Sequence, residues 1–283
     1  MAVSLTFTYF LGRYLPPMTA FLTGPQLYTY VNYVYDDKTV FDDTILTYGT
    51  DYILVASNSY LCWRILRVPI KRFHVLQWAS AALVASFAVA SLAGAICHHF
   101  LYASLNTWYF RLLWRICVGS VGAAGGFLGL CGNELARIPL DSTTAPRFPL
   151  PRIPTFFWIL WSVFFFGVIY VGLYSMRNPA CDIFLTGVTQ APPTFYICVV
   201  LLARRSWSSI VAEKYVRLLA IGLLANCILL PGYDLLNYLN LPDGVRNLFL
   251  HTVLFCAWTA QGLSLREFIE GAEKAQESVD KAS

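Results

Sequence analysis

Residues 156–174 read FFWILWSVFFFGVIYVGLY, a run of apolar, aromatic and small side chains without a single charge. A helix needs about 20 predominantly apolar residues to cross the hydrocarbon core of a bilayer. This stretch meets that requirement and is the most apolar segment of the chain. It therefore predicts a membrane-spanning helix, and the rest of the chain is divided outward from it.

Six further apolar windows of similar length lie on the two sides of this segment. The seven predicted spans are Thr44–Leu66, His74–Cys97, Tyr109–Gly132, Phe156–Tyr174, Ile183–Ala203, Val216–Leu236 and Val245–Leu263. The connectors between them contain prolines, charges or turn residues, as in the proline-rich stretch 139–154. The sequence therefore predicts an all-α, polytopic membrane protein built as a bundle of seven transmembrane helices.

The composition of the whole chain agrees with this fold class. Hydrophobic residues make up 57% of the 283 residues and charged residues only 13%, against roughly 25% charged residues in soluble domains. The net charge is +4, and the eight cysteines form no C-x-x-C pair. These features exclude a disordered protein, a nucleic-acid-binding protein and a secreted disulfide scaffold.

The basic residues are distributed unequally between the two faces of the predicted bundle. With seven spans, the loops after the second, fourth and sixth spans share a face with the N-terminus. Of the 20 lysines and arginines, that face contains only Arg13, Lys38, Arg111, Arg115, Arg177 and Arg246. Because cytoplasmic loops are enriched in lysine and arginine, we predict an outer N-terminus and a cytoplasmic C-terminus.

Two segments lie outside the seven windows. Residues 1–43 are aromatic and apolar but contain Arg13 and the pair Pro16-Pro17, which predicts an interfacial or re-entrant segment on the outer side. An eighth span is the alternative for this segment. Residues 266–283 carry charges at helical spacing and predict a cytoplasmic tail that forms a solvated helix. The predicted domains are therefore 1–43, 44–265 and 266–283.

Ionisable side chains inside a span are costly and are candidates for function. The few in this chain gather in the outer third of the predicted bilayer: Asp51, His98, His99, Arg111, Arg115, Asp234 and His251, together with the polar Asn247. Histidine and carboxylate are ligands of zinc, so His98, His251 and Asp51 are candidate metal ligands. Without a metal, Asp51 and Asp234 are candidate catalytic acids and bases, and the remaining residues of this set are candidates to line the pocket.

The same residues also fit purely structural roles. Asp51 would pair with Arg111 or Arg115, since a buried charge needs a partner. His98 would contact lipid headgroups and water at the membrane surface, and His251 would donate to a backbone carbonyl of a neighbouring helix.

The third span is rich in glycine. Gly122 and Gly126, and likewise Gly125 and Gly129, are four residues apart, which is the G-x-x-x-G spacing that lets two helices approach closely in a membrane. Tight packing inside the bundle and a contact with a partner helix from another molecule are both compatible with this spacing.

The fifth span contains two consecutive prolines, Pro192 and Pro193. Proline removes a backbone hydrogen bond, so the helix is expected to kink or unwind there. The neighbouring Gln190 would then line a cavity.

The histidine at the end of the second span, His98, and the N-x-x-x-H formed by Asn247 and His251 in the seventh resemble the alkaline-ceramidase and adiponectin-receptor superfamily. The resemblance implies a seven-helix membrane hydrolase with an intramembrane zinc, bound by His98 and His251. Asp51 would replace the third-span aspartate of that superfamily. Gly94 and Asn247 stand where the superfamily has a serine and a histidine.

Three functions are compatible with these observations. The first is a metal-dependent hydrolase of a lipid amide or ester, with zinc held by His98, His251 and Asp51. The second is an acid-initiated isoprenoid cyclase or isomerase that uses Asp51 and Asp234. The third is a non-catalytic receptor, transporter or subunit of a membrane complex. In each case the bilayer, and in the first two a hydrophobic small molecule, is the expected partner.

Overall fold

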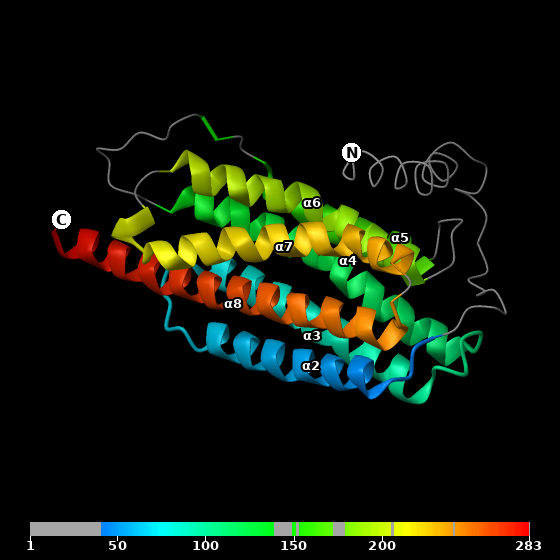
Figure 1. Ribbon diagram of the computed structural model, residues 1–283. Coiled ribbons are helices and arrows are strands. Elements are labelled where there is room, and N and C mark those ends of the chain that lie inside the picture. Colours follow the sequence, from blue (N-terminus) through cyan, green and yellow to red (C-terminus); the bar gives the residue numbers. More distant parts are fainter. Residues whose placement is uncertain are drawn as a thin grey trace, which may run out of the picture.

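The computed structural model describes residues 41–138, 149–150, 153–171, 179–204, 207–239 and 241–282 of the chain. This part of the chain is all-α (Figure 1). Its helices are α2 (Ile45–Leu66), α3 (His74–Phe100), α4 (Trp108–Arg137), α5 (Thr155–Val171), α6 (Pro179–Ala203), α7 (Glu213–Tyr238) and α8 (Asp243–Ala282), with the short 3₁₀ helix η2 (Trp207–Ser209) before α7. The predicted all-α fold class is thus confirmed, and each predicted window overlaps one helix.

Three of the described helices are long and apolar enough to cross a membrane: α3, α4 and residues Asp243–Ser278 of α8. Two shorter apolar helical segments, Thr155–Gly167 and Thr189–Ala203, accompany them. Large apolar side chains on the outside of the bundle are more than half exposed, among them Ile53, Trp78, Val163, Phe164, Phe195, Ile221 and Ile228. Such a surface is expected of a protein whose solvent is lipid. That all seven predicted windows cross the membrane stays a prediction.

The helices pack as a ring with one helix attached outside it. α2, α3, α4, α6, α7 and α8 contact one another in that order, and α8 closes the ring against α2. α5 packs on α4 (Figure 1). Near the middle of α8, Trp258 stacks on Phe87 of α3 with 4.2 Å between ring centroids. α2 and α8 begin side by side at one end of the bundle, where Gly244 of α8 lies against Thr44 (Figure 1). The candidate site lies at this end.

The glycines of α4 form the surface on which neighbouring helices of the same chain pack. A Cβ atom at Gly126 would overlap Ser162 and the backbone of Trp158 in α5, and one at Gly129 would overlap the Trp158 ring. On the next face of α4, a Cβ atom at Gly125 would lie 2.6 Å from the carbonyl oxygen of Thr189 in α6. The G-x-x-x-G pairs therefore bring α5 and α6 against α4. A partner helix from another molecule stays a prediction.

The prolines of α6 do not interrupt the helix, which runs continuously through Pro192 and Pro193. Pro193 cannot bond to the carbonyl of Thr189, and this carbonyl accepts a hydrogen bond from Trp161 Nε1 of α5 at 3.2 Å instead. Gln190 is fully buried, and its Nε2 donates to the carbonyl of Val121 in α4 at 2.6 Å. The polar groups near the prolines thus dock α6 on its neighbours.

The tail continues the last helix and is packed against two loops. α8 extends as one helix to Ala282, and Phe268 and Ile269 are fully buried beyond the predicted end of the seventh span. Trp207 of η2 meets the Phe268 ring edge-on at 5.1 Å. The Glu273 carboxylate accepts hydrogen bonds from the backbone amides of Arg72 and Phe73 at 2.8 and 2.9 Å. Residues 266–282 are therefore part of the fold. The predicted outer segment lies outside the described residues up to residue 40.

Candidate functional site

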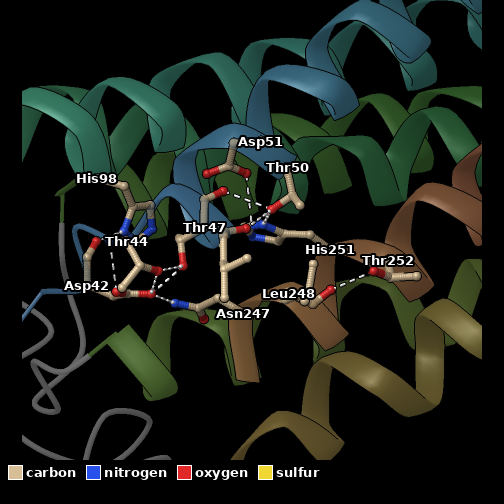
Figure 2. Close-up of polar contacts among 11 residues, drawn as sticks. Asp42, Thr44, Thr47, Thr50, Asp51, His98, Asn247, Leu248, His251 and Thr252 are labelled. Atoms are coloured by element: carbon tan, nitrogen blue, oxygen red, sulfur yellow. Dashed lines mark hydrogen bonds and ion pairs between the residues drawn. The ribbon is translucent and has the colours of Figure 1, made fainter. Parts of the chain in front are cut away.

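The start of α2 is organised by Asp42, two residues before the N-cap residue Thr44. The Asp42 carboxylate accepts hydrogen bonds from the backbone amide of Thr44 at 3.0 Å and from the Thr44 hydroxyl at 3.2 Å. It also accepts one from Thr47 Oγ1, one turn into the helix, and one from Asn247 Nδ2 of α8 at 2.9 Å. A single carboxylate thus joins the beginnings of α2 and α8 (Figure 2).

Asp42 is held as a buried anion. Burial by itself raises its pKa, but the hydrogen bonds from Thr47, Thr44 and Asn247 outweigh that effect, so the pKa lies below its usual value of 3.8. The positive end of the α2 dipole, to which Thr44 and Thr47 belong, favours the same charged form. Asp42 therefore provides a fixed negative charge at the end of the bundle where α2 and α8 begin.

Asp51 and His251 face each other two turns below this charge. Oδ1 of Asp51 in α2 lies 3.4 Å from Nε2 of His251 in α8, and the two residues are only 5% and 8% exposed. On the other side of the imidazole ring, Nδ1 lies 2.7 Å from Oγ1 of Thr50. Figure 2 shows the imidazole between the threonine hydroxyl and the carboxylate.

The hydrogen-bond partners fix the tautomer of His251. The single hydrogen of the Thr50 hydroxyl is directed at a backbone carbonyl, that of Leu46 at 2.6 Å or that of Thr47 at 2.9 Å. Thr50 Oγ1 therefore accepts a hydrogen bond from His251 Nδ1, and the lone pair of Nε2 faces the Asp51 carboxylate. Two lone pairs repel each other unless a proton lies between them, so the pair holds one exchangeable proton.

His98 is part of the same end of the bundle but has a different partner. Its Nδ1 lies 2.7 Å from the backbone carbonyl oxygen of Asp42, which can only accept, so Nδ1 carries the hydrogen. The imidazole also stacks on the Phe41 ring, with 4.3 Å between centroids. His98 thus fastens the end of α3 to the segment before α2 (Figure 2).

The other predicted pocket residues are distributed over several helices. His99 stacks on Tyr48 at 4.2 Å, Arg111 and Arg115 are half-buried in the first two turns of α4, and Asn247 donates to Asp42. Among the described residues, Asp51 pairs with His251 and with no arginine. Gln190 lies at the contact between α4 and α6. The side chain of Asp234 lies outside the described residues.

A zinc site needs more ligands than this geometry brings together. Catalytic zinc uses three protein ligands and one open position. Among the residues whose side chains are described, no three histidine, cysteine, aspartate or glutamate side chains are grouped closely enough to hold a metal ion. Of the three predicted ligands, Asp51 and His251 are paired and His98 binds a carbonyl oxygen. The described residues therefore do not fit a catalytic zinc, and zinc stays a prediction.

Two contributors, Asp42 and Thr50, were not predicted from the sequence. A signal for the threonines exists: Thr44, Thr47 and Thr50 recur every three residues directly before Asp51, which places a polar stripe along the first two turns of an apolar helix. Asp42 carries no comparable signal, because Asp43 beside it is equally polar. Only the structure shows that Asp42 is buried while Asp43 is exposed.

Replacing Asp42 with asparagine is expected to destabilise the protein by about 2 kcal/mol, since hydrogen bonds to a charged group are worth roughly that much. Because the pKa of Asp42 is lowered in the fold, its contribution is complete above about pH 4 and is lost as the pH falls through the folded-state value. Thermal unfolding in detergent between pH 3 and pH 7, a range set by these values, measures this, with exposed Asp43→Asn as the control. Equal losses in the two variants would contradict the role of Asp42.

Comparison with known proteins gives the chain no family. No protein-family model, no curated protein and no solved structure matches it. The resemblance to the ceramidase and adiponectin-receptor superfamily therefore stays a prediction, and function is argued from the site itself.

Proposed function

We propose that this chain is a seven-span membrane hydrolase that cleaves a lipid amide or ester near the outer leaflet, with Asp51 and His251 as its acid–base pair. The observation that carries the proposal is the buried contact of 3.4 Å between the carboxylate and the imidazole. A buried carboxylate and imidazole in contact inside a span are expensive to maintain. Proton exchange with a substrate is a reason to keep such a pair.

The chemistry follows from the one proton that the pair exchanges. When the pair has lost that proton, it takes one from a water molecule, whose oxygen forms a bond with the acyl carbon. As the carbon–nitrogen or carbon–oxygen bond breaks, the pair returns the proton to the leaving amine or alcohol. One water is consumed, and a carboxylic acid and an amine or alcohol are formed. Thr50 orients the imidazole during both transfers, and Asp42 holds a negative charge two helical turns away, at the start of α2.

The surroundings of the pair favour a lipid substrate. Thr50 is half-buried on the contact between α2 and α8. On the same helix, Leu46 and Ile53 are 41% and 56% exposed toward the outside of the bundle. A substrate that reaches the pair from this side travels through an apolar surface, which lipids cross without loss of solvation. Release of fatty acid from lipid amides and esters by the purified protein in lipid vesicles tests the proposal.

The orientation places this pair on the outer side. The basic residues predict a cytoplasmic C-terminus, and α2 and α8 both begin at the opposite end of the bundle. A peptide tag added after Ser283 is therefore expected to be removed by a protease supplied from the cytoplasmic side of the membrane. A tag that resists this protease until the membrane is dissolved would reverse the orientation.

A further inference from the structure

Two buried tryptophan–asparagine pairs connect neighbouring helices in the described part of the bundle. In one, Nε1 of Trp158 in α5 donates to Oδ1 of Asn133 in α4 at 3.4 Å. In the other, Nε1 of Trp258 in α8 donates to Oδ1 of Asn226 in α7 at 3.3 Å. The two tryptophans are almost equally buried, at 2% and 3% exposed. The pairs are therefore alike in chemistry and in burial.

The two pairs differ in the remaining atoms of the asparagine. In Asn133 both atoms of the side-chain amide have hydrogen-bond partners. Its Nδ2 donates to the carbonyl of Ile153 at 2.9 Å, and its Oδ1 also accepts from the Tyr196 hydroxyl at 2.9 Å. In Asn226, by contrast, Nδ2 has no hydrogen-bond partner among the described residues, although the residue is only 1% exposed. Buried polar atoms are almost always paired, with protein or with ordered water.

A second incomplete amide lies one turn further along α8. Nε2 of the fully buried Gln261 donates to the carbonyl of Gly222 in α7 at 3.1 Å, and its Oε1 has no partner in the part of the chain that the structure describes. Flipping either side-chain amide, so that its oxygen and nitrogen exchange places, does not provide the missing hydrogen-bond partner. A reversed Asn226 would turn its NH₂ group toward the indole N–H, and a reversed Gln261 would turn its oxygen toward a carbonyl oxygen.

The unpartnered atoms lie on facing sides of one helix pair. Gly222 and Asn226 are four residues apart on α7, and Trp258 and Gln261 are three apart on α8, so each pair of residues shares a helix face. The two faces are joined by the two hydrogen bonds described above. Among the described residues, the α7–α8 contact therefore leaves one donor and one acceptor unsatisfied, Nδ2 of Asn226 and Oε1 of Gln261.

We propose that the contact between α7 and α8 binds an ordered water molecule between Asn226 and Gln261. Water matches these two groups because it can accept and donate hydrogen bonds at the same time. Here it accepts from Nδ2 of Asn226 and donates to Oε1 of Gln261. A hydroxyl group of a lipid has the same donor and acceptor chemistry, but residues that are 1% exposed or less leave it no way to approach. The site is independent of the Asp51–His251 pair.

Radiolytic labelling in detergent or nanodiscs tests the site, because X-rays convert a bound water molecule into a hydroxyl radical that oxidises the nearest side chains. Mass spectrometry is expected to show Trp258 oxidised several-fold faster than Trp158, although both indoles are buried. Trp158 is the internal control, since both side-chain amide atoms of its partner Asn133 already have hydrogen-bond partners in the protein. Equal rates at the two tryptophans in the wild-type protein would overturn the proposal without any variant.

A variant then tests the assignment of the water to this helix contact. Gln261→Leu removes the acceptor and fills its space with an apolar side chain of similar size. It is expected to lower the oxidation rate of Trp258 to that of Trp158. A Trp258 rate unchanged in folded Gln261→Leu would overturn the assignment. Gln261→Met replaces the amide with an unbranched apolar side chain and provides the same comparison, with the same fall in rate expected, if Gln261→Leu does not fold.

Discussion

Gly126→Ala is expected to destabilise the bundle by about 3 kcal/mol or more, because overpacking of an ordered interface costs 1–3 kcal/mol and more when backbone must move. The new Cβ atom would overlap the carbonyl oxygen of Trp158 and Oγ of Ser162 and would lie 2.9 Å from the backbone nitrogen of Ser162. α5 would have to move away from α4. Helices in a membrane associate through close packing, so the loss falls on the main force that holds α5 in place.

The matched control for this variant is Gly167→Ala on α5, where a Cβ atom would meet nothing within 4 Å. It is expected to change stability by less than about 1 kcal/mol, the usual difference between glycine and alanine in a helix. The stability of both variants is measured by heating detergent-purified protein and quantifying, by size-exclusion chromatography, the fraction that stays folded at each temperature. Adding Ser162→Ala to Gly126→Ala should not restore stability, because the Trp158 carbonyl remains. A Gly126→Ala protein that melts with the wild type would refute this packing.

Most of the fold follows from local sequence, because a span must carry about 20 apolar residues wherever its neighbours lie. Each predicted window overlaps one helix for this reason. The charges at helical spacing after Leu263 predict a solvated helix, and α8 does continue to Ala282. Its burial was not predicted: Leu265, Phe268, Ile269 and Ala272 stand at positions i, i+3, i+4 and i+7 and are buried, and Phe268 contacts Trp207 of η2. Whether a proline pair interrupts α6 depends on a tertiary donor, Trp161, that local sequence does not reveal.

The candidate site is harder to predict from the sequence than the fold, because its contacts join distant parts of the chain. Polarity inside apolar windows singles out Asp51 and His251, which the structure places in contact. Polarity does not say which donors meet which acceptors. His98 was expected beside these two, but its nearest partner is a backbone carbonyl, that of Asp42, and every residue has such a group. Backbone acceptors and buried carboxylates such as Asp42 are therefore the part of the site that needs coordinates.

Asp51→Asn is expected to lower the rate of lipid amide or ester hydrolysis by about 10²-fold or more, the usual contribution of a general acid–base group. An amide keeps the shape of the carboxylate but neither accepts nor returns a proton at pH 7. His251→Gln should cause a loss of similar size. Because the two groups share one proton, the double variant is expected to lose little beyond either single variant. Fatty acid released in vesicles, measured by mass spectrometry at equal amounts of folded protein, gives the rates.

The control is His74→Gln, at the exposed start of α3 and the opposite end of the bundle, which should keep the wild-type rate. A chelator arm separates the acid–base pair from zinc chemistry. If Asp51 and His251 catalyse hydrolysis without a metal, the rate is unchanged after dialysis against chelator, and Asp51→Asn is inactive with or without added zinc. Loss of activity on chelation and its return with zinc would instead assign His98, His251 and Asp51 to a metal. Full activity of Asp51→Asn would remove the proposed hydrolase mechanism, because no other described carboxylate contacts His251.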